Sequence, residues 1–123
     1  MMEQTCIRAL ADHKQINRCK RQIGEIETQL TKLSSIVCLI GNDTRLKILY
    51  LLQAEKKLCV CDLSDILNMT VPAISQQLRK LKDGGIISSQ REGTVIFYSL
   101  VSKHRKVVER ILSHSLNKEL LAV

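Results

Sequence analysis

Two cysteines separated by one residue, Cys59 and Cys61, are the part of this sequence best suited to chemistry. They precede a short stretch whose apolar spacing predicts a helix over 62–68. Where an extended lead-in meets a helix, both sulfurs can turn toward one ion, and the helix N-terminus stabilises thiolates. Because two thiolates are too few to hold a soft ion tightly, we expect a third ligand. Cys6 is the only cysteine before the first predicted helix.

The number and type of these ligands favour particular metals. Three thiolates suit soft or borderline ions such as Cd(II), Pb(II), Hg(II) or Bi(III), whereas zinc usually takes a fourth ligand. A C-x-C pair alone is a weak signal, because most free cysteines serve as small apolar filler. We expect that ordinary role for Cys38, which follows Ile36 and Val37 on an apolar helical stripe. Cys19 lies beside basic residues and is interpreted as a spectator, with a role as fourth ligand as the alternative.

The cysteine count and the start of the chain indicate the compartment for this chemistry. The sequence has neither a charged-then-apolar start nor an apolar run of the roughly 20 residues that span a bilayer. We therefore predict a cytoplasmic protein with no membrane partner. In a reducing compartment, an odd count of 5 cysteines argues against a disulfide framework and for thiol or metal chemistry.

Apolar spacing predicts the elements that must hold these cysteines in place. Residues 1–14 are interpreted as an N-terminal metal-binding arm and residues 15–123 as a single domain. With 45% hydrophobic but only 2% aromatic residues, the core must be aliphatic, which suits packed helices. The expected order is a helix from Ile16 to about Ile40, a helix after Gly41-Asn42-Asp43, helices over 62–68 and 71–83, strands over 86–91 and 94–100, and a helix over 103–121. This order predicts a mainly α (α+β) winged helix-turn-helix with a two-stranded hairpin wing and helical extensions at both ends.

The predicted helix over 71–83, with Thr70 as its expected N-cap, has one apolar and one polar, basic face. A glutamine can pair with adenine through two hydrogen bonds, and Arg or Lys can pair with guanine or phosphate. Since residues near the start of the second helix of a helix-turn-helix enter the major groove most deeply, Ser75 and Gln76 are the expected base readers. Gln77 lies at the edge of this face. The side chains expected to hold the DNA backbone are Arg79, Lys80 and Lys82.

Charge supports a nucleic-acid partner without proving one. The formal net charge is +7 and the isoelectric point is about 9.4, which favours polyanions. The polar helix face alone would be an ordinary solvated surface. Its place between a short helix and a hairpin, with Glu92-Gly93 as the turn, is what favours DNA reading. Arg91 at the hairpin tip could contact a minor groove or a phosphate, or simply be a solvated turn charge.

Three segments resemble the ArsR/SmtB family of metal-responsive repressors, most closely its CadC-like cadmium- and lead-sensing branch. They are Leu58-Cys59-Val60-Cys61-Asp62-Leu63, Ile74-Ser75-Gln76-Gln77-Leu78-Arg79-Lys80-Leu81 and Gly93-Thr94-Val95-Ile96-Phe97-Tyr98-Ser99-Leu100. The resemblance implies a homodimer joined through its first and last helices, which binds palindromic double-stranded operator DNA. It further implies release, and derepression of a metal efflux or resistance gene, when Cd(II) or Pb(II) binds, with Zn(II) as a further candidate. The implied ligands are Cys59 and Cys61 of one subunit and Cys6 from the arm of the other.

The sequence departs from the family pattern in two places. Many members carry a second arm cysteine where this chain has Leu10. The family's other metal site uses Asp, His, His and Glu across the dimer, and here only His104 remains. The other three positions hold Ser102, Ser115 and Lys118. We therefore expect no zinc site on the last helix and ordinary surface or interface roles for its histidines.

Two other functions fit parts of the same pattern. A reversible disulfide between the cysteines would make a thiol-redox-sensing repressor on the same winged helix. A winged helix can also serve only to bind protein partners. An enzyme is not expected, and neither is an organic cofactor, because the sequence has no glycine-rich phosphate loop and no H-E-x-x-H motif.

Overall fold

The computed structural model describes residues 8–116, and the chain divides into two compact units at Ser34 and Ser35. The first unit contains most of α1 (His13–Ile40). Asp12 caps this helix, because its carboxylate accepts a hydrogen bond from the Gln15 amide at 3.0 Å. The cap explains why α1 begins three residues before the predicted start at Ile16. Several large apolar side chains of this unit are exposed, namely Ile23, Ile26, Leu30 and Leu33.

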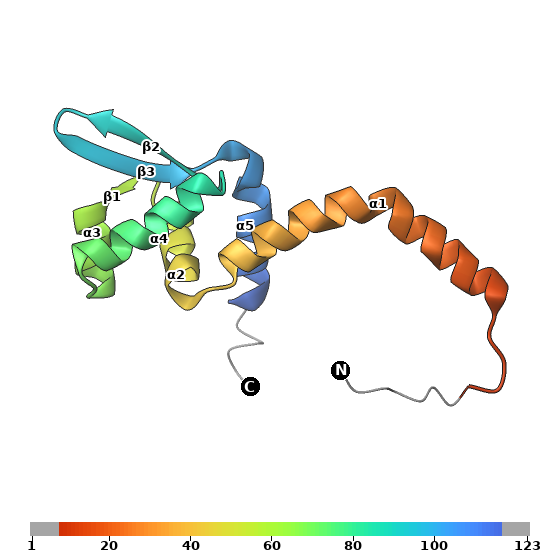
Figure 1. Ribbon diagram of the computed structural model, residues 1–123. Coiled ribbons are helices and arrows are strands. Elements are labelled where there is room, and N and C mark those ends of the chain that lie inside the picture. The colour runs from red at the N-terminus through yellow and green to blue at the C-terminus, as the bar shows by residue number, and fades with distance from the viewer. Residues whose placement is uncertain (1–7, 117–123) are drawn as a thin grey trace. The chain divides into compact units, whose positions relative to one another are not determined.

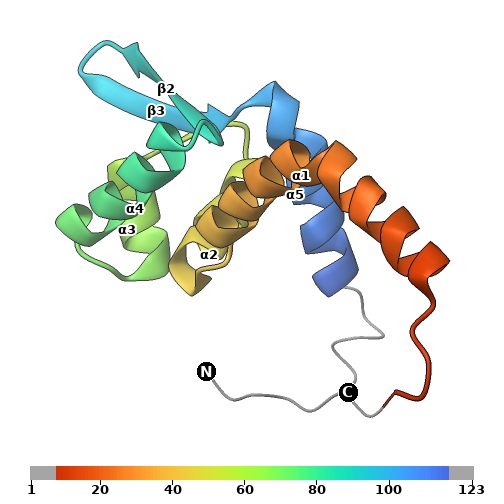
Figure 2. The same ribbon diagram turned by 45° about the vertical axis from the view of Figure 1, so that its right-hand side comes forward.

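The second unit holds the end of α1, four further helices and a small sheet (Figures 1 and 2). The helices are α2 (Asp43–Ala54), α3 (Val60–Leu67), α4 (Val71–Asp83) and α5 (Ser102–Ser115). The strands are β1 (Leu58–Cys59), β2 (Ile87–Glu92) and β3 (Val95–Leu100). All pairing is antiparallel in the order β1-β3-β2, so β3 is the central strand. The long β2–β3 hairpin, which we call the wing, extends past the helices in both views.

The core of this second unit is aliphatic, as the composition predicts. The side chains most fully removed from solvent come from α2, α3, α4 and the start of β2, and the set is Ile48, Leu49, Leu52, Leu63, Ile74, Leu78, Leu81, Ile86 and Ile87. Burying such side chains is the main favourable term in folding. The sequence thereby fixes the orientation of α4, since Ile74, Leu78 and Leu81 face inward and the polar side must face out.

The connection between α3 and α4 forms the turn of the helix-turn-helix. Asn68 ends α3 in the left-handed conformation at φ 53°, which asparagine tolerates better than most residues. The hydroxyl of Thr70 accepts a hydrogen bond from the Ala73 amide at 3.3 Å, and Pro72 lies in the first turn of α4. The predicted cap is confirmed. With the hairpin, these helices make a winged helix-turn-helix.

Two further details differ from the sequence-based prediction. The sheet has three strands instead of two, because Leu58 and Cys59 pair with Tyr98 and Phe97. Helix α3 begins at Val60, before the predicted residue 62. The predicted end of the last helix at residue 121 lies outside the described residues. Within 8–116, no helix combines the length and apolar character needed to cross a membrane.

Candidate thiol site and nucleic-acid interface

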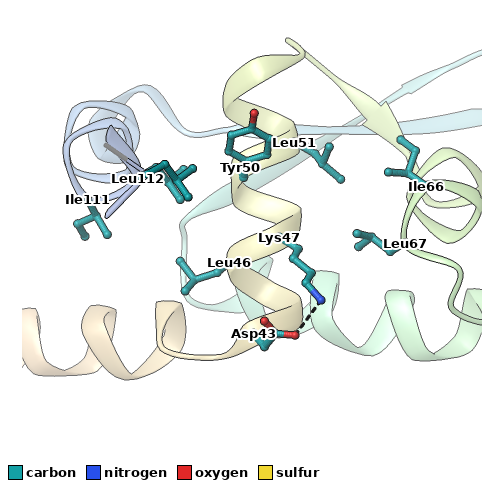
Figure 3. A pocket seen from close by; sticks show the side chains of 10 residues that line it. Asp43, Leu46, Lys47, Tyr50, Leu51, Ile66, Leu67, Ile111 and Leu112 are labelled. Atoms are coloured by element: carbon teal, nitrogen blue, oxygen red, sulfur yellow. Dashed lines mark ion pairs between the residues drawn. The ribbon is translucent and has the colours of Figure 1, made fainter. Parts of the chain in front are cut away.

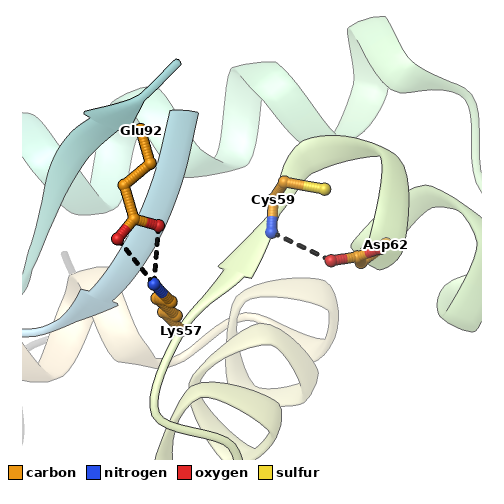
Figure 4. A network of polar contacts seen from close by, with 4 residues as sticks. All are labelled: Lys57, Cys59, Asp62 and Glu92. Carbon is orange, nitrogen blue, oxygen red and sulfur yellow. Dashed lines mark hydrogen bonds and ion pairs between the residues drawn. The ribbon is translucent and has the colours of Figure 1, made fainter. Parts of the chain in front are cut away.

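The thiol pair, Cys59 and Cys61, lies where β1 ends and the helix-turn-helix begins. Figure 4 shows Cys59 at this junction. Cys59 is the last residue of β1 and the N-cap of α3, while Cys61 is in the first turn of that helix. Cys59 is half-buried, Cys61 is exposed, and both are free thiols. The Cys59 amide donates to the Asp62 carboxylate at 3.3 Å between N and Oδ2. One backbone group at the start of α3 is therefore satisfied without using either sulfur.

The donor set is soft but incomplete in the part of the chain that the structure describes. Two sulfurs suit a soft cation, because sulfur is the donor that such ions prefer. Between residues 8 and 116, however, no group of three or more His, Cys, Asp or Glu side chains gathers closely enough to hold an ion. Cys6, the predicted third ligand, lies outside the described residues. The thiol pair therefore needs a further ligand before it can bind a metal tightly.

The remaining two cysteines of the described range lie on α1. Cys19 is exposed, in the first unit. Cys38, in the second unit, is exposed as well, so the expectation that it fills the core is wrong. The helical stripe that faces the core runs through Ile36 and Ile40, four residues apart. A residue two positions along a helix points about 200° away from the first, so Cys38 must turn outward.

A lysine connects the thiol pair with the wing (Figure 4). Lys57 lies two residues before Cys59, and its ammonium contacts both carboxylate oxygens of Glu92, at 2.7 and 2.5 Å. The same ammonium lies 4.6 Å from the centroid of the Phe97 ring. Phe97 is the residue that pairs with Cys59 across the sheet. Lys57 precedes β1, and its side chain passes over the central strand β3 to reach the outer strand β2.

The predicted DNA-reading residues of α4 differ in their exposure. Ser75, Gln76, Arg79, Lys80 and Lys82 are all exposed. Gln77 is half-buried, and its side-chain oxygen accepts a hydrogen bond from Arg45 Nη1 at 2.8 Å. Gln77 therefore faces α2 with its carbonyl end. On β2, Arg91 is exposed one residue before Glu92, near the tip of the wing.

Comparison with known sequences identifies the family to which this winged helix-turn-helix belongs. The family described as bacterial regulatory protein, arsR family, matches residues 42–89, which contain the thiol pair and the whole helix-turn-helix. A cadmium resistance transcriptional regulatory protein CadC homolog from Staphylococcus aureus is 30% identical over 115 residues, covering 93% of each chain. This chain belongs to the arsR family.

Solved structures agree with this assignment to the arsR family. Reduced HlyU from Vibrio cholerae has a TM-score of 0.69 and 29% sequence identity, covering 76% of this chain and 97% of that one. The AntR antimony-specific transcriptional repressor has a TM-score of 0.59 and 33% identity, covering 71% and 82%. The arsR family and the winged helix-turn-helix fold are those of DNA-binding transcriptional regulators, which are not enzymes.

An apolar pocket of about 500 Å³ lies between α2, α3 and α5 of this arsR-family fold (Figure 3). Aliphatic side chains such as Leu46, Ile66 and Ile111 line it together with Tyr50. Its only charged lining residues, Asp43 and Lys47, neutralise each other at 2.9 Å. The pocket therefore offers no set of metal ligands and is chemically distinct from the thiol pair.

Sequence reasoning missed two functional candidates in this arsR-family chain, Arg45 and Lys57. Arg45 donates from Nε to the Leu39 carbonyl at 2.6 Å as well as to Gln77, so it joins the end of α1 to α4. Lys57 reaches a residue 35 positions away in the sequence. Both are ordinary basic residues in a basic chain, and nothing in their local spacing distinguishes them from solvated charges.

Proposed function

We propose that this arsR-family chain is a metal-responsive transcriptional repressor. It binds double-stranded operator DNA as a homodimer, and it is released when Cd(II) or Pb(II), with Zn(II) as a further candidate, binds the thiolates of Cys6, Cys59 and Cys61. The observation that carries this proposal is the position of the thiol pair, at the junction of wing sheet and helix-turn-helix. A ligand bound there acts on both DNA-contacting elements at once. The expected result is derepression of a metal efflux or resistance gene.

The exposed face of α4 supports the DNA-binding half of the proposal. Ser75 and Gln76, in the first half of α4, read base edges in the major groove, while Arg79 and Lys80 hold phosphates. Arg91 contacts DNA from the wing. Among the proposed DNA-contacting residues, Gln77 is the least well placed to bind DNA. Its side-chain oxygen already accepts a hydrogen bond from Arg45, so mainly its amide hydrogens are free to contact DNA.

Exposed apolar side chains on the terminal helices support a dimer. On α5, Val107 and Ile111 are 43% and 37% exposed, and they lie one turn apart on the same face. The first unit exposes a comparable row on α1, from Ile23 to Leu33. Contiguous exposed apolar surface usually marks a protein interface. A twofold dimer would present two α4 helices to two half-sites about one DNA turn apart.

The soft donors and the similarity to a cadmium resistance regulator support the metal-sensing half. Cys59 and Cys61 contribute sulfur ligands from the start of α3, and Cys6 contributes the third from the arm. Binding supplies free energy that favours the conformation in which these ligands converge. To weaken DNA binding about a hundredfold, the coupling between metal and DNA must be roughly 2.7 kcal/mol. A multi-thiolate site can provide that much.

The decisive experiment compares the wild-type chain with Cys6→Ser/Cys59→Ser/Cys61→Ser, using fluorescence anisotropy on promoter DNA under reducing conditions. We expect Cd(II) to release the wild type and to produce a thiolate-to-metal charge-transfer band. The triple variant should bind DNA equally well but lose both responses. Cys19→Ser/Cys38→Ser is the matched control and should behave like the wild type. Metal-triggered release that survives in the triple variant would refute the proposal.

A redox sensor is the second candidate, and the free, accessible thiols of the pair favour it. The similarity to HlyU, solved in a form described as reduced, points the same way. Here peroxide would oxidise two thiols to a disulfide and itself be reduced to water. Release by peroxide, reversed by dithiothreitol and insensitive to Cd(II) under reducing conditions, would favour this candidate. Failure to bind any duplex would instead favour a protein-binding winged helix.

A further inference from the structure

The tip of the wing carries an acidic residue, Glu92, which is unfavourable on a surface proposed to approach DNA. Glu92 ends β2 immediately after Arg91, and Gly93 then turns the chain at φ 65°. A bare carboxylate there would repel phosphates and offset the attraction of its arginine neighbour. Lys57 neutralises it, with 51% and 45% of the two side chains exposed. Whether the Glu92 carboxylate at the wing tip is masked therefore depends on this one ion pair.

The same lysine is tied to the backbone of the thiol pair. Only Leu58 separates Lys57 from Cys59, and Leu58 and Cys59 are the whole of β1. Their pairing with Tyr98 and Phe97 is what holds β1 on the sheet. Because a strand of two residues has few hydrogen bonds to lose, a small movement of Cys59 would carry Lys57 with it. The contacts with Glu92 and with the Phe97 ring would then lengthen together.

We propose that Lys57 is a positioning residue for the wing, which masks Glu92 when the repressor binds DNA and withdraws from it when the thiol pair is occupied. This inference rests on the proposed function and adds a second route to it. Release would come from a change in the charge of the wing as well as from any change at α4. No other cation competes for this role in the structure as described, where Glu92 pairs with Lys57 alone.

A double-mutant cycle on metal-free protein tests the masking. Anisotropy titrations on promoter DNA would compare wild type, Lys57→Gln, Glu92→Gln and the double variant. We expect Lys57→Gln to weaken binding about two- to fivefold, the range of a surface ion pair. Glu92→Gln should bind at least as well as wild type, and the double variant should match Glu92→Gln. If the double variant stays as weak as Lys57→Gln, Lys57 acts on DNA directly and the masking role is wrong.

Two matched controls accompany the cycle. Lys56→Gln removes the same charge one residue away, and within residues 8–116 Lys56 has no ion-pair partner. This variant should lose less affinity, and Glu92→Gln should not rescue what it loses. Lys57→Arg keeps the cation and should bind DNA within about twofold of wild type. A loss in Lys57→Arg equal to that in Lys57→Gln would also contradict the masking role.

Amide hydrogen exchange on DNA-free protein tests the withdrawal. We expect Cd(II) to speed exchange over 95–100, the strand that pairs with β1, in the wild type but not in Cys59→Ser/Cys61→Ser. Lys57→Gln should show part of this increase without metal. Metal-triggered DNA release with unchanged exchange in the wing would overturn this inference and leave the proposed function intact. Loss of release itself would count against the proposed function.

Discussion

The side-chain oxygen of Gln77 on α4 accepts a hydrogen bond from the guanidinium of Arg45 on α2, at 2.8 Å. Arg45 also donates to the Leu39 carbonyl at the end of α1. Both hydrogen bonds are charge-assisted, because the guanidinium is cationic, and both are partly buried, which limits competition from water. One side chain of α2 therefore links α4 to the end of α1.

Replacing Arg45 should destabilise the fold. Arg45→Ala leaves a partly buried carbonyl and a partly buried amide without their partner, which costs about 1–3 kcal/mol. Urea unfolding followed by circular dichroism would measure the loss. Arg79→Ala is the matched control, because that arginine is exposed on α4, and its effect should stay within about 0.5 kcal/mol. Equal stability of wild type and Arg45→Ala would show that the contacts contribute nothing.

The neighbouring glutamines of α4 should have separable effects on DNA binding. Gln76 is exposed while Gln77 is committed to Arg45. We expect Gln76→Ala to relax preference at one operator position by about 1–3 kcal/mol, the value of a good base contact. Gln77→Ala should change operator preference little. Binding to a panel of single-base operator variants would measure both effects. If Gln77→Ala changed the operator preference more than Gln76→Ala, Gln77 would be the residue that reads the base.

Much of the fold followed from apolar spacing. The core positions of α4 are set by several residues at helical spacing, so their pattern exceeds local noise. Strand β1 was missed because two residues carry no period, and its pairing with β3 depends on a segment almost forty positions away. The early start of α3 was missed as well. This start is marked by a single side-chain contact, in which the Asp62 carboxylate accepts a hydrogen bond from the Cys59 amide.

The candidate site was only partly predictable for the same reason. Residue type alone marked Cys59 and Cys61, because few side chains can hold a soft ion. The partners that give the site its context, Lys57 with Glu92, are 35 residues apart and meet only through the sheet. Cys38 was assigned to the core from its apolar neighbours in sequence. Helical geometry places it on the opposite side from those that are buried.

A glycine at the end of α4 should be sensitive to substitution. A Cβ on Gly84 would lie 2.1 Å from Leu39 Cδ2, so the leucine would have to move. We expect Gly84→Ala to destabilise the protein by about 1–3 kcal/mol through overpacking, as measured by urea unfolding. Gly24→Ala, in the middle of α1 with nothing within 4 Å of the added atom, is the control. It should raise helix stability by about 0.5–1 kcal/mol. A neutral Gly84→Ala would mean that Leu39 has room to turn aside.

The two apolar rows of α5 should respond differently to a charge. Val108 and Leu112 are buried in the core, whereas Val107 and Ile111 are exposed one residue earlier in each turn. Placing Glu at residue 111 (Ile111→Glu) should therefore leave the fold of the second unit intact but disrupt the proposed dimer. Sedimentation velocity should show a monomer, and operator affinity should fall at least tenfold, because one protomer engages only one half-site.

Lys106→Glu controls for the introduced charge on the exposed surface of the same helix. It should leave the oligomeric state unchanged. Circular dichroism distinguishes loss of fold from loss of dimer, since a misfolded Ile111→Glu would lose helical signal whereas a folded monomer would retain it. A folded Ile111→Glu that remains dimeric would remove this face of α5 from the interface. The exposed apolar row of α1 would then have to supply the dimer contacts without it.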